Sequence, residues 1–130
     1  MSKAFDLLKE YGVFYVATVN GGKPAVRPFG AVMEYKGEIH IATANVKDVY
    51  KQLKADPCVQ LAAWKAGTHD WIRITGKAEE RNDKETKQAM LDACPVLKPI
   101  FGSADNPVYT TFAVTEAEAV LYTADGAEKL

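Results

Sequence analysis

The segment 43–53, TANVKDVYKQL, combines residue types that suit the binding of a phosphate group. Asn45 is well placed to cap the start of a helix, and Asp48 three residues later completes a capping-box pattern. Free backbone N–H groups at such a helix start, together with Lys47 and then Lys51, favour a bound anion. A lysine there costs the helix alone about 0.3–1 kcal/mol, and an anion would relieve that conflict. The alternative interpretation is a capped surface helix with solvated lysines.

A strand and a helix are needed to position these groups. Ile39, Ile41 and Thr43 alternate with two smaller or more polar residues, a pattern typical of a half-buried strand. The apolar face of the following helix is spaced at i, i+3, i+4 and i+7 and comprises Val46, Val49, Tyr50 and Leu53. This helix is expected to end near Asp56-Pro57, because proline cannot continue it.

The rest of the chain predicts a meander of antiparallel strands. These strands are expected over 13–19, 25–33, 39–43, 59–64, 71–78 and 110–122. Asn20-Gly21-Gly22 suits the first hairpin turn, and helices are expected before residue 11 and over 84–93. Five or six strands with helices at the ends and at one crossover predict a mainly β fold with peripheral helices, built as a small closed or split β-barrel.

Two predicted strands carry side chains that are unusual in a core. Arg27 and Phe29 share one face of the second strand, and Trp71 shares a face with Arg73, because side chains alternate along a strand. Pro28 cannot donate to a ladder and should mark an edge or a bulge, which often lies beside a binding site. Alternatively, Arg27 is an exposed strand residue and Trp71 is a core or interface aromatic.

Composition limits the classes of protein to which the chain can belong. Its 130 residues, 48% hydrophobic and 25% charged, suit one globular domain over residues 1–130. No apolar run approaches the roughly 20 residues that cross a bilayer, so no membrane partner is expected. A net charge of −1 argues against nucleic acid as the main partner. The N-terminus has no apolar signal core, so a cytoplasmic location is expected.

Cysteine and histidine spacing gives no metal site. Cys58 and Cys94 form no C-x-x-C pair and are expected to be reduced thiols. His40 and His69 lack the spacing of zinc ligands. His69-Asp70 is interpreted as an exposed turn, and no catalytic acid, base or nucleophile is assigned.

Taken in order, these motifs resemble the FMN-binding split-barrel superfamily, which includes pyridoxamine 5′-phosphate oxidase. The similar segments are GVFYVAT (12–18), KPAVRPFG (23–30), IHIAT (39–43) with Lys47, DP (56–57) and WIRITGKA (71–78). The order and spacing of these segments carry the resemblance. The short length, together with RPFG at 27–30, is most similar to the branch of Nim-type nitroimidazole-resistance proteins.

The resemblance implies a split barrel that forms a homodimer, with FMN in clefts between the subunits. It assigns the FMN phosphate to Arg27, Thr43 and Lys47. Asn45 and Lys51 are implied as additional phosphate-site residues.

For the rest of FMN, the resemblance implies a second group of residues. Pro28, Phe29 and Gly30 would lie along the ribityl chain or the flavin ring. Trp71 and Arg73 would approach the flavin from the other subunit. No metal is implied.

The activity implied is that of a flavin-dependent oxidoreductase acting on an unknown small molecule, with the redox chemistry carried by the flavin. True pyridoxamine 5′-phosphate oxidases are longer and carry a C-terminal substrate-phosphate segment without counterpart here, so that activity is not expected. Nim-type proteins commonly have a histidine before the helix lysine, where this chain has Val46, which argues against nitro reduction. The alternatives are a non-enzymatic flavin carrier or electron-transfer protein, and a barrel that binds a deazaflavin or haem instead of FMN.

Overall fold

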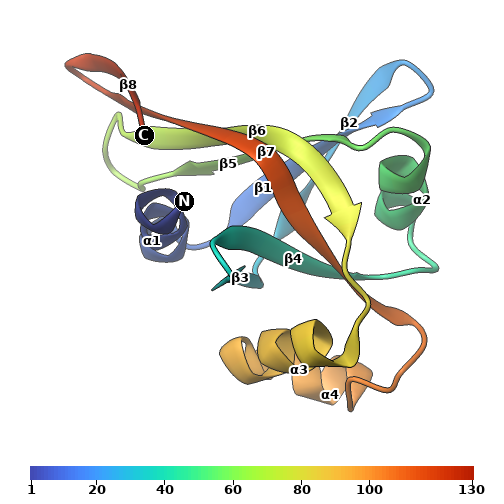
Figure 1. Cartoon of the computed structure of the whole chain (residues 1–130). Helices are drawn as coiled ribbons and strands as arrows, with labels where there is room; N and C mark the ends of the chain where they lie inside the picture. The colour runs from blue at the N-terminus through green and yellow to red at the C-terminus, as the bar shows by residue number, and fades with distance from the viewer.

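One antiparallel sheet with helices around it makes up the fold (Figure 1). The computed structural model describes residues 1–130. The strands are β1 (Phe14–Asn20), β2 (Lys23–Phe29), β3 (Val32–Tyr35), β4 (Glu38–Ala44), β5 (Cys58–Trp64), β6 (Trp71–Glu80), β7 (Tyr109–Thr123) and β8 (Gly126–Lys129). The helices are α1 (Ser2–Tyr11), α2 (Asp48–Ala55), α3 (Lys84–Ala93) and α4 (Lys98–Phe101), with a 3-10 turn η1 (Pro95–Leu97).

The strand order leaves the barrel split. Seven strands follow the order β2-β1-β5-β6-β7-β4-β3, and β8 pairs with β7 beyond this path. The two ends of the order, β2 and β3, are consecutive in the chain but do not pair with each other. Gly30 and Ala31 therefore carry the chain across the opening in the barrel. The predicted split β-barrel is confirmed.

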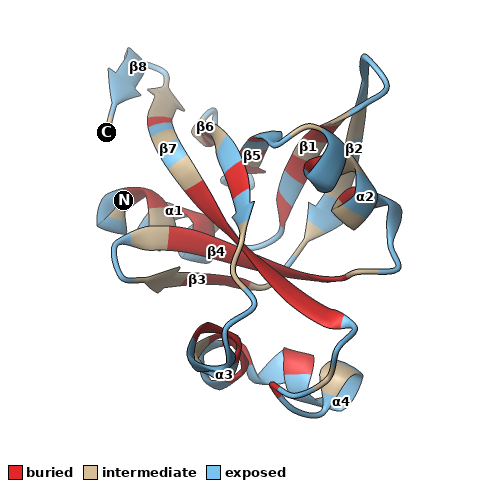
Figure 2. Ribbon diagram, turned by 45° about the vertical axis from the view of Figure 1, so that its right-hand side comes forward, coloured by how far each residue is buried: buried red, intermediate tan, exposed pale blue.

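Most of the core lies inside the curved sheet. The burial pattern of β1 and β5 alternates, so Phe14, Val16 and Leu61 point inward while their neighbours face outward. Strand β4 and the first half of β7 are buried almost continuously (Figure 2). Helix α2 adds Val49 and Leu53 to this core.

A second, smaller core lies between β3, β4, β7 and the helices α3 and α4. Its buried residues are Met33, Ala42, Met90, Leu91, Cys94, Leu97, Ala104 and Tyr109. Figure 1 shows α3 and α4 together at one end of the molecule, away from α1 and α2. Helix α3 begins at an Asp83 cap, whose carboxylate accepts from the Thr86 N–H at 3.0 Å, as its sequence predicts.

The antiparallel pairing of β6 with β7 is interrupted by a bulge. The register shifts between Thr75 and Lys77, opposite Glu116, which adopts a positive φ of 49°. A Cβ on Gly76 would lie 2.7 Å from the Thr115 carbonyl oxygen, so only glycine fits this close approach.

Two expectations for the strands were wrong. The single strand predicted over 25–33 is two strands, because Gly30 and Ala31 cross the opening and Val32 and Met33 are both buried. The sequence also predicted five or six strands, whereas the structure has eight, including the exposed β8. Helices α1 and α3 agree with prediction, and α2 ends before Pro57 as expected.

Candidate functional site

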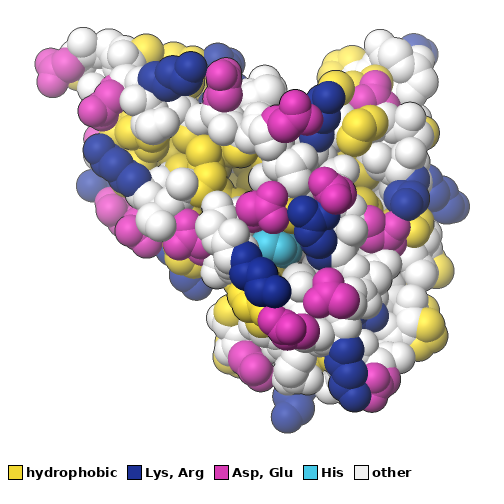
Figure 3. Space-filling view, in the orientation of Figure 1, with side chains coloured by type: hydrophobic (Ala, Val, Ile, Leu, Met, Phe, Trp, Pro, Cys, Tyr) yellow, Lys and Arg dark blue, Asp and Glu magenta, His cyan; other side chains and the backbone are white.

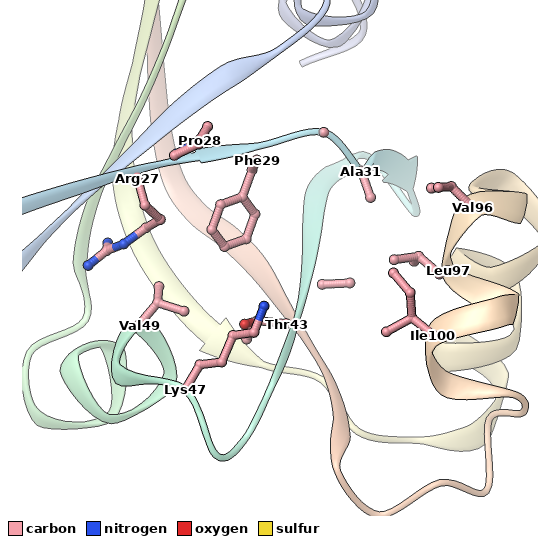
Figure 4. Close-up of a pocket in the computed structure, with 12 residues that line it drawn as sticks. Arg27, Pro28, Phe29, Ala31, Thr43, Lys47, Val49, Val96, Leu97 and Ile100 are labelled. Atoms are coloured by element: carbon pink, nitrogen blue, oxygen red, sulfur yellow. The ribbon is translucent and has the colours of Figure 1, made fainter.

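A cavity of about 410 Å³ opens at the split in the barrel (Figure 4). Its lining residues are Arg27, Pro28, Phe29, Gly30, Ala31, Ala42, Thr43, Lys47, Val49, Val96, Leu97 and Ile100. They come from β2 and the crossing segment on one side, β4 and the start of α2 below, and η1 and α4 on the other side (Figure 4). The volume lies within the ~300–1,000 Å³ range of small-molecule sites.

Strand β2 supplies Arg27, Pro28 and Phe29 to this cavity. It is the first strand in the sheet order and is therefore an edge strand. Proline is tolerated there because its missing N–H can face the side of the strand that has no neighbour. The prediction that Pro28 marks an edge is confirmed. Phe29 is partly buried, and its ring contacts the core near Phe14, with 6.2 Å between ring centroids.

Helix α2 begins beside the cavity, two residues later than predicted. Lys47, not Asn45, is the N-cap, and no side chain accepts a hydrogen bond from the first turn. Asn45 is used elsewhere: its Nδ2 donates to the Pro107 carbonyl at 2.9 Å, and its backbone N–H donates to Val108. Val46 precedes the helix and is exposed, so its assignment to the apolar face was also wrong. The uncapped N–H groups of α2 remain available to a ligand.

The Arg27 guanidinium is held by neutral oxygen atoms. Its Nη1 donates to the Val16 carbonyl at 3.2 Å and to Thr18 Oγ1 at 2.8 Å, and its Nη2 donates to Gln52 Oε1 at 2.6 Å. Burial lowers the pKa of Arg27 below its ordinary value, partly offset by the negative charge of Asp48. The arginine nevertheless stays charged, because a guanidinium is not deprotonated in proteins.

Arg27 and Lys47 bring positive charge into the cavity that no ion pair neutralises. Neither residue forms a salt bridge with a carboxylate of the chain. Figure 4 shows the Lys47 amine and the Thr43 hydroxyl directed to the same part of the cavity. A second hollow of about 500 Å³ adjoins the first, shares Arg27, Lys47 and Val49 with it, and is also lined by the carboxylate of Asp48. This end of the cavity is therefore suited to an anion.

The opposite wall is apolar and was not identified from the sequence. Val96 and Ile100 are exposed at the surface, and Leu97 anchors the segment in the second core. Proline at the start of both η1 and α4 fits two short helical turns. The one available signal was the spacing of apolar residues at 96, 97 and 100.

Four predicted site residues lie outside this cavity. Asn45 binds the loop before β7, as described above. Lys51 lies one turn further along α2, beside a different hollow that also includes Asn20 and Gly21. Trp71 and Arg73 lie on β6, on the outer face of the sheet. The other six of the ten predicted site residues line the cavity within one chain: Arg27, Pro28, Phe29, Gly30, Thr43 and Lys47.

Trp71 and Arg73 form an aromatic cluster with Tyr122. The Trp71 and Tyr122 rings stack, with centroids 4.1 Å apart and planes 8° from parallel. Arg73 Nη2 donates to the Tyr122 hydroxyl at 2.6 Å, and its guanidinium lies over both rings. Trp64 and Tyr15 are exposed beside Trp71 around a shallow apolar hollow.

The chemistry that the cavity residues can supply is limited. The lining includes no carboxylate, imidazole, thiol or phenol, so a bound group would have to provide any redox chemistry. No group of three or more His, Cys, Asp or Glu residues is arranged to hold a metal ion. None of the helices has the length and apolar character required to cross a membrane. Charges of both signs are interspersed on the face seen in Figure 3, without the basic field of a nucleic-acid site.

Comparison with solved structures finds chains of the same fold. A NimC/NimA family protein from Clostridium acetobutylicum is 36% identical, with a TM-score of 0.92 and coverage of 100% of this chain and 93% of that chain. General Stress Protein 26 from Bacillus anthracis str. Sterne is 16% identical, with a TM-score of 0.76 and coverage of 98% and 97%. A heme binding protein from Mycobacterium smegmatis is 16% identical, with a TM-score of 0.78 and coverage of 98% and 56%.

Sequence comparison assigns the chain to a family. No curated protein sequence matches it. The family model described as pyridoxamine 5′-phosphate oxidase matches residues 2–123. Because this model matches almost the whole chain, the chain belongs to the pyridoxamine 5′-phosphate oxidase family. Within that family it is similar to the NimC/NimA protein, which is 36% identical over 100% of this chain.

Proposed function

We propose that the chain is a flavoprotein that binds FMN at the split of the barrel and acts as a flavin-dependent oxidoreductase. The observation that carries the proposal is the pairing of two cations, Arg27 and Lys47, without carboxylate partners at one end of a largely apolar cavity. A ligand with a phosphate at one end and a flat apolar ring at the other matches this division.

The residues present fit the two parts of FMN. Arg27, Lys47, Thr43 and the first N–H groups of α2 would hold the phosphate. The apolar lining, from Phe29 across to the η1–α4 wall, would lie along the ring. When bound, the flavin would supply hydride and electron transfer, while the chain's own residues bind it, orient it and exclude water.

The same lining argues against haem. Haem iron is held by histidine, cysteine, methionine or tyrosine, and none of these lines the cavity. The Mycobacterium smegmatis heme binding protein shares the fold at 16% identity, which says nothing about this site. FMN is therefore the proposed cofactor.

A homodimer is part of the proposal. The outer face of β2, β1, β5 and β6 exposes Val26 (68%), Tyr15 (52%) and Trp64 (58%) beside Trp71. Exposed apolar surface of this kind, rich in aromatic rings, suits a two-fold interface. In such a dimer Trp71 and Arg73 would approach the flavin of the partner subunit.

The second candidate is a flavin carrier or electron-transfer protein. It is favoured by the absence of any acid or base among the cavity residues that could exchange a proton with a substrate. Anaerobic mixing of the FMN-loaded protein with NADH or NADPH, followed by quinone or nitro acceptors, separates the two. Catalytic turnover supports the enzyme, whereas reduction without turnover of any acceptor supports the carrier.

Pyridoxamine 5′-phosphate should be a poor substrate in the same assays. Once a flavin phosphate occupies Arg27 and Lys47, the cavity offers no further cation for a second phosphate. The cofactor itself is tested by the visible absorption spectrum of the purified or reconstituted protein. A flavin spectrum is expected, and a haem or deazaflavin spectrum would reject FMN.

A further inference from the structure

We propose that Gln52 is a positioning and binding residue of the anion site: its side-chain oxygen holds Arg27, and its side-chain nitrogen donates to the same phosphate. The inference rests on the function proposed above and adds a residue to that site. Gln52 lies in the second turn of α2, and no pattern in the sequence singles it out.

Three side chains form a closed set of hydrogen bonds. Gln52 Oε1 accepts from Thr18 Oγ1 at 2.6 Å and from Arg27 Nη2 at 2.6 Å. Thr18 Oγ1 in turn accepts from Arg27 Nη1 at 2.8 Å. Thr18 is buried on β1, so β1, β2 and α2 are joined at one point.

The chemistry of these contacts fixes which way the Gln52 amide faces. A guanidinium only donates, so Arg27 needs the amide oxygen, and the Thr18 hydroxyl, which accepts a hydrogen bond from Arg27, donates its own hydrogen to the same oxygen. The amide nitrogen, with two N–H donors, must then face the other way. It makes no hydrogen bond within the chain and is not a buried unpaired group. Gln52 lines the hollow that Arg27, Lys47 and Asp48 also line, and the neighbouring hollow beside Lys51. The proposal assigns these free donors to an anion in the first of the two.

Neutral glutamine matters for the charge of the site. A carboxylate at this position would pair with Arg27 and cancel the charge that an anionic ligand needs. The amide keeps the arginine in one orientation without neutralising it. Two guanidinium N–H groups remain free, because only three of its five are engaged.

The test is the isosteric substitution Gln52→Glu, measured as the ratio of FMN to riboflavin affinity of the apoprotein. The variant keeps the contacts to Arg27 and Thr18, so its thermal stability without ligand should equal or exceed that of the wild type. Its preference for FMN should fall about tenfold or more, because a charge-assisted contact is lost and a negative charge is added. Gln88→Glu on the exposed face of α3 is the charge-matched control and should keep the wild-type ratio.

Two further measurements complete the design. Inorganic phosphate should raise the melting temperature of wild-type apoprotein but not that of Gln52→Glu. Thr18→Val, which releases Gln52 without adding charge, should give an intermediate FMN preference. A wild type without FMN preference would overturn the phosphate site itself. A wild-type preference that survives in Gln52→Glu would overturn the role of Gln52 alone.

Discussion

At the scale of single residues, the two cations of the cavity are held in different ways. Arg27 is fixed by three neutral oxygens from β1 and α2, whereas the Lys47 amine is unpaired at the helix start. The Lys47 amine points into the cavity beside Thr43, whereas the Arg27 guanidinium points away from it, towards its partners on β1 and α2 (Figure 4). In the proposed complex, the phosphate would bind the Lys47 amine and the guanidinium N–H groups that the chain leaves free.

This arrangement predicts that Arg27→Ala or Lys47→Ala weakens FMN binding by about 1.5–3 kcal/mol, the scale of a hydrogen bond to a charged group. Isothermal titration of the apoproteins with FMN measures the change. Lys23→Ala removes a lysine at the start of β2, outside the cavity, and should leave the affinity unchanged. Wild-type affinity in both cavity variants would make these residues ordinary surface charges.

His40 gives a pH prediction that is independent of the ligand. Its side chain is buried, and its Nδ1 lies 2.9 Å from the Glu38 carbonyl oxygen. Burial lowers the pKa of His40 below the ordinary 6.5. The nearby charges of Glu38, Arg81 and Asp83 have smaller effects on this pKa. The unfolded chain therefore binds a proton more readily than the folded one, so stability present above about pH 6.5 is lost as the pH falls below it.

Urea unfolding of the apoprotein at about pH 7.5 and about pH 5.5 measures this loss. As the pH falls, the free energy of unfolding should decrease, and His40 can account for at most about 1.4 kcal/mol of this decrease per pH unit. His40→Asn keeps a donor for the Glu38 carbonyl and should show a smaller decrease. An equal decrease in both proteins would assign the effect to other groups.

At the scale of elements, the start of α2 is unfavourable for the helix itself, which agrees with the proposed anion site. A lysine at the N-cap supplies no acceptor to the first turn and opposes the helix dipole. Lys47→Ser should therefore raise the stability of the apoprotein by about 1 kcal/mol in urea unfolding while weakening FMN binding. A loss of apoprotein stability in this variant would show that Lys47 has a structural role instead.

The elements that the sequence predicted well are those with local signals. Helix α3 has an Asp83 cap and a Cys94-Pro95 stop, and β1, β5 and β6 alternate between inward and outward residues. The start of α2 was misplaced because Asn45, a good cap by type, is recruited by the loop before β7, 62 residues away. That competition is a tertiary contact and leaves no local signal.

Only part of the candidate site was predicted, because some of its residues carry a local sequence signal and others are brought together only by tertiary contacts. The pattern at 43–53 singled out Thr43 and Lys47, and the family resemblance joined Arg27 to them; all three line the cavity. The η1–α4 wall and the bonds of Gln52 depend on segments that meet only through the sheet topology. Neither could be derived from spacing along the chain.

At the scale of the whole molecule, the outer face of the sheet exposes apolar side chains that the proposed dimer would cover. The buried rings of Phe14, Tyr109 and Phe112 fit within one chain, whereas Trp64 and Tyr15 remain exposed beside the Trp71–Tyr122 stack. A dimer is therefore expected by light scattering at micromolar concentration. Trp71→Asp should shift the protein towards monomer and lower its flavin content, because it places a charge in the interface.

Gln88→Asp, on an exposed face of α3, is the control and should remain dimeric. A monomeric wild type that retains one FMN per chain would contradict a cleft shared between subunits. A dimer unaffected by Trp71→Asp would place the interface on another face.

The central claim is that this cavity recognises a flavin through its phosphate. Titration of wild-type apoprotein with FMN and with riboflavin, followed by quenching of flavin fluorescence, tests it most directly. The two ligands share the ring and differ in the phosphate that Arg27 and Lys47 would bind. FMN should bind about ten- to a hundredfold more tightly. Equal affinities, or binding of neither ligand, would contradict the assignment.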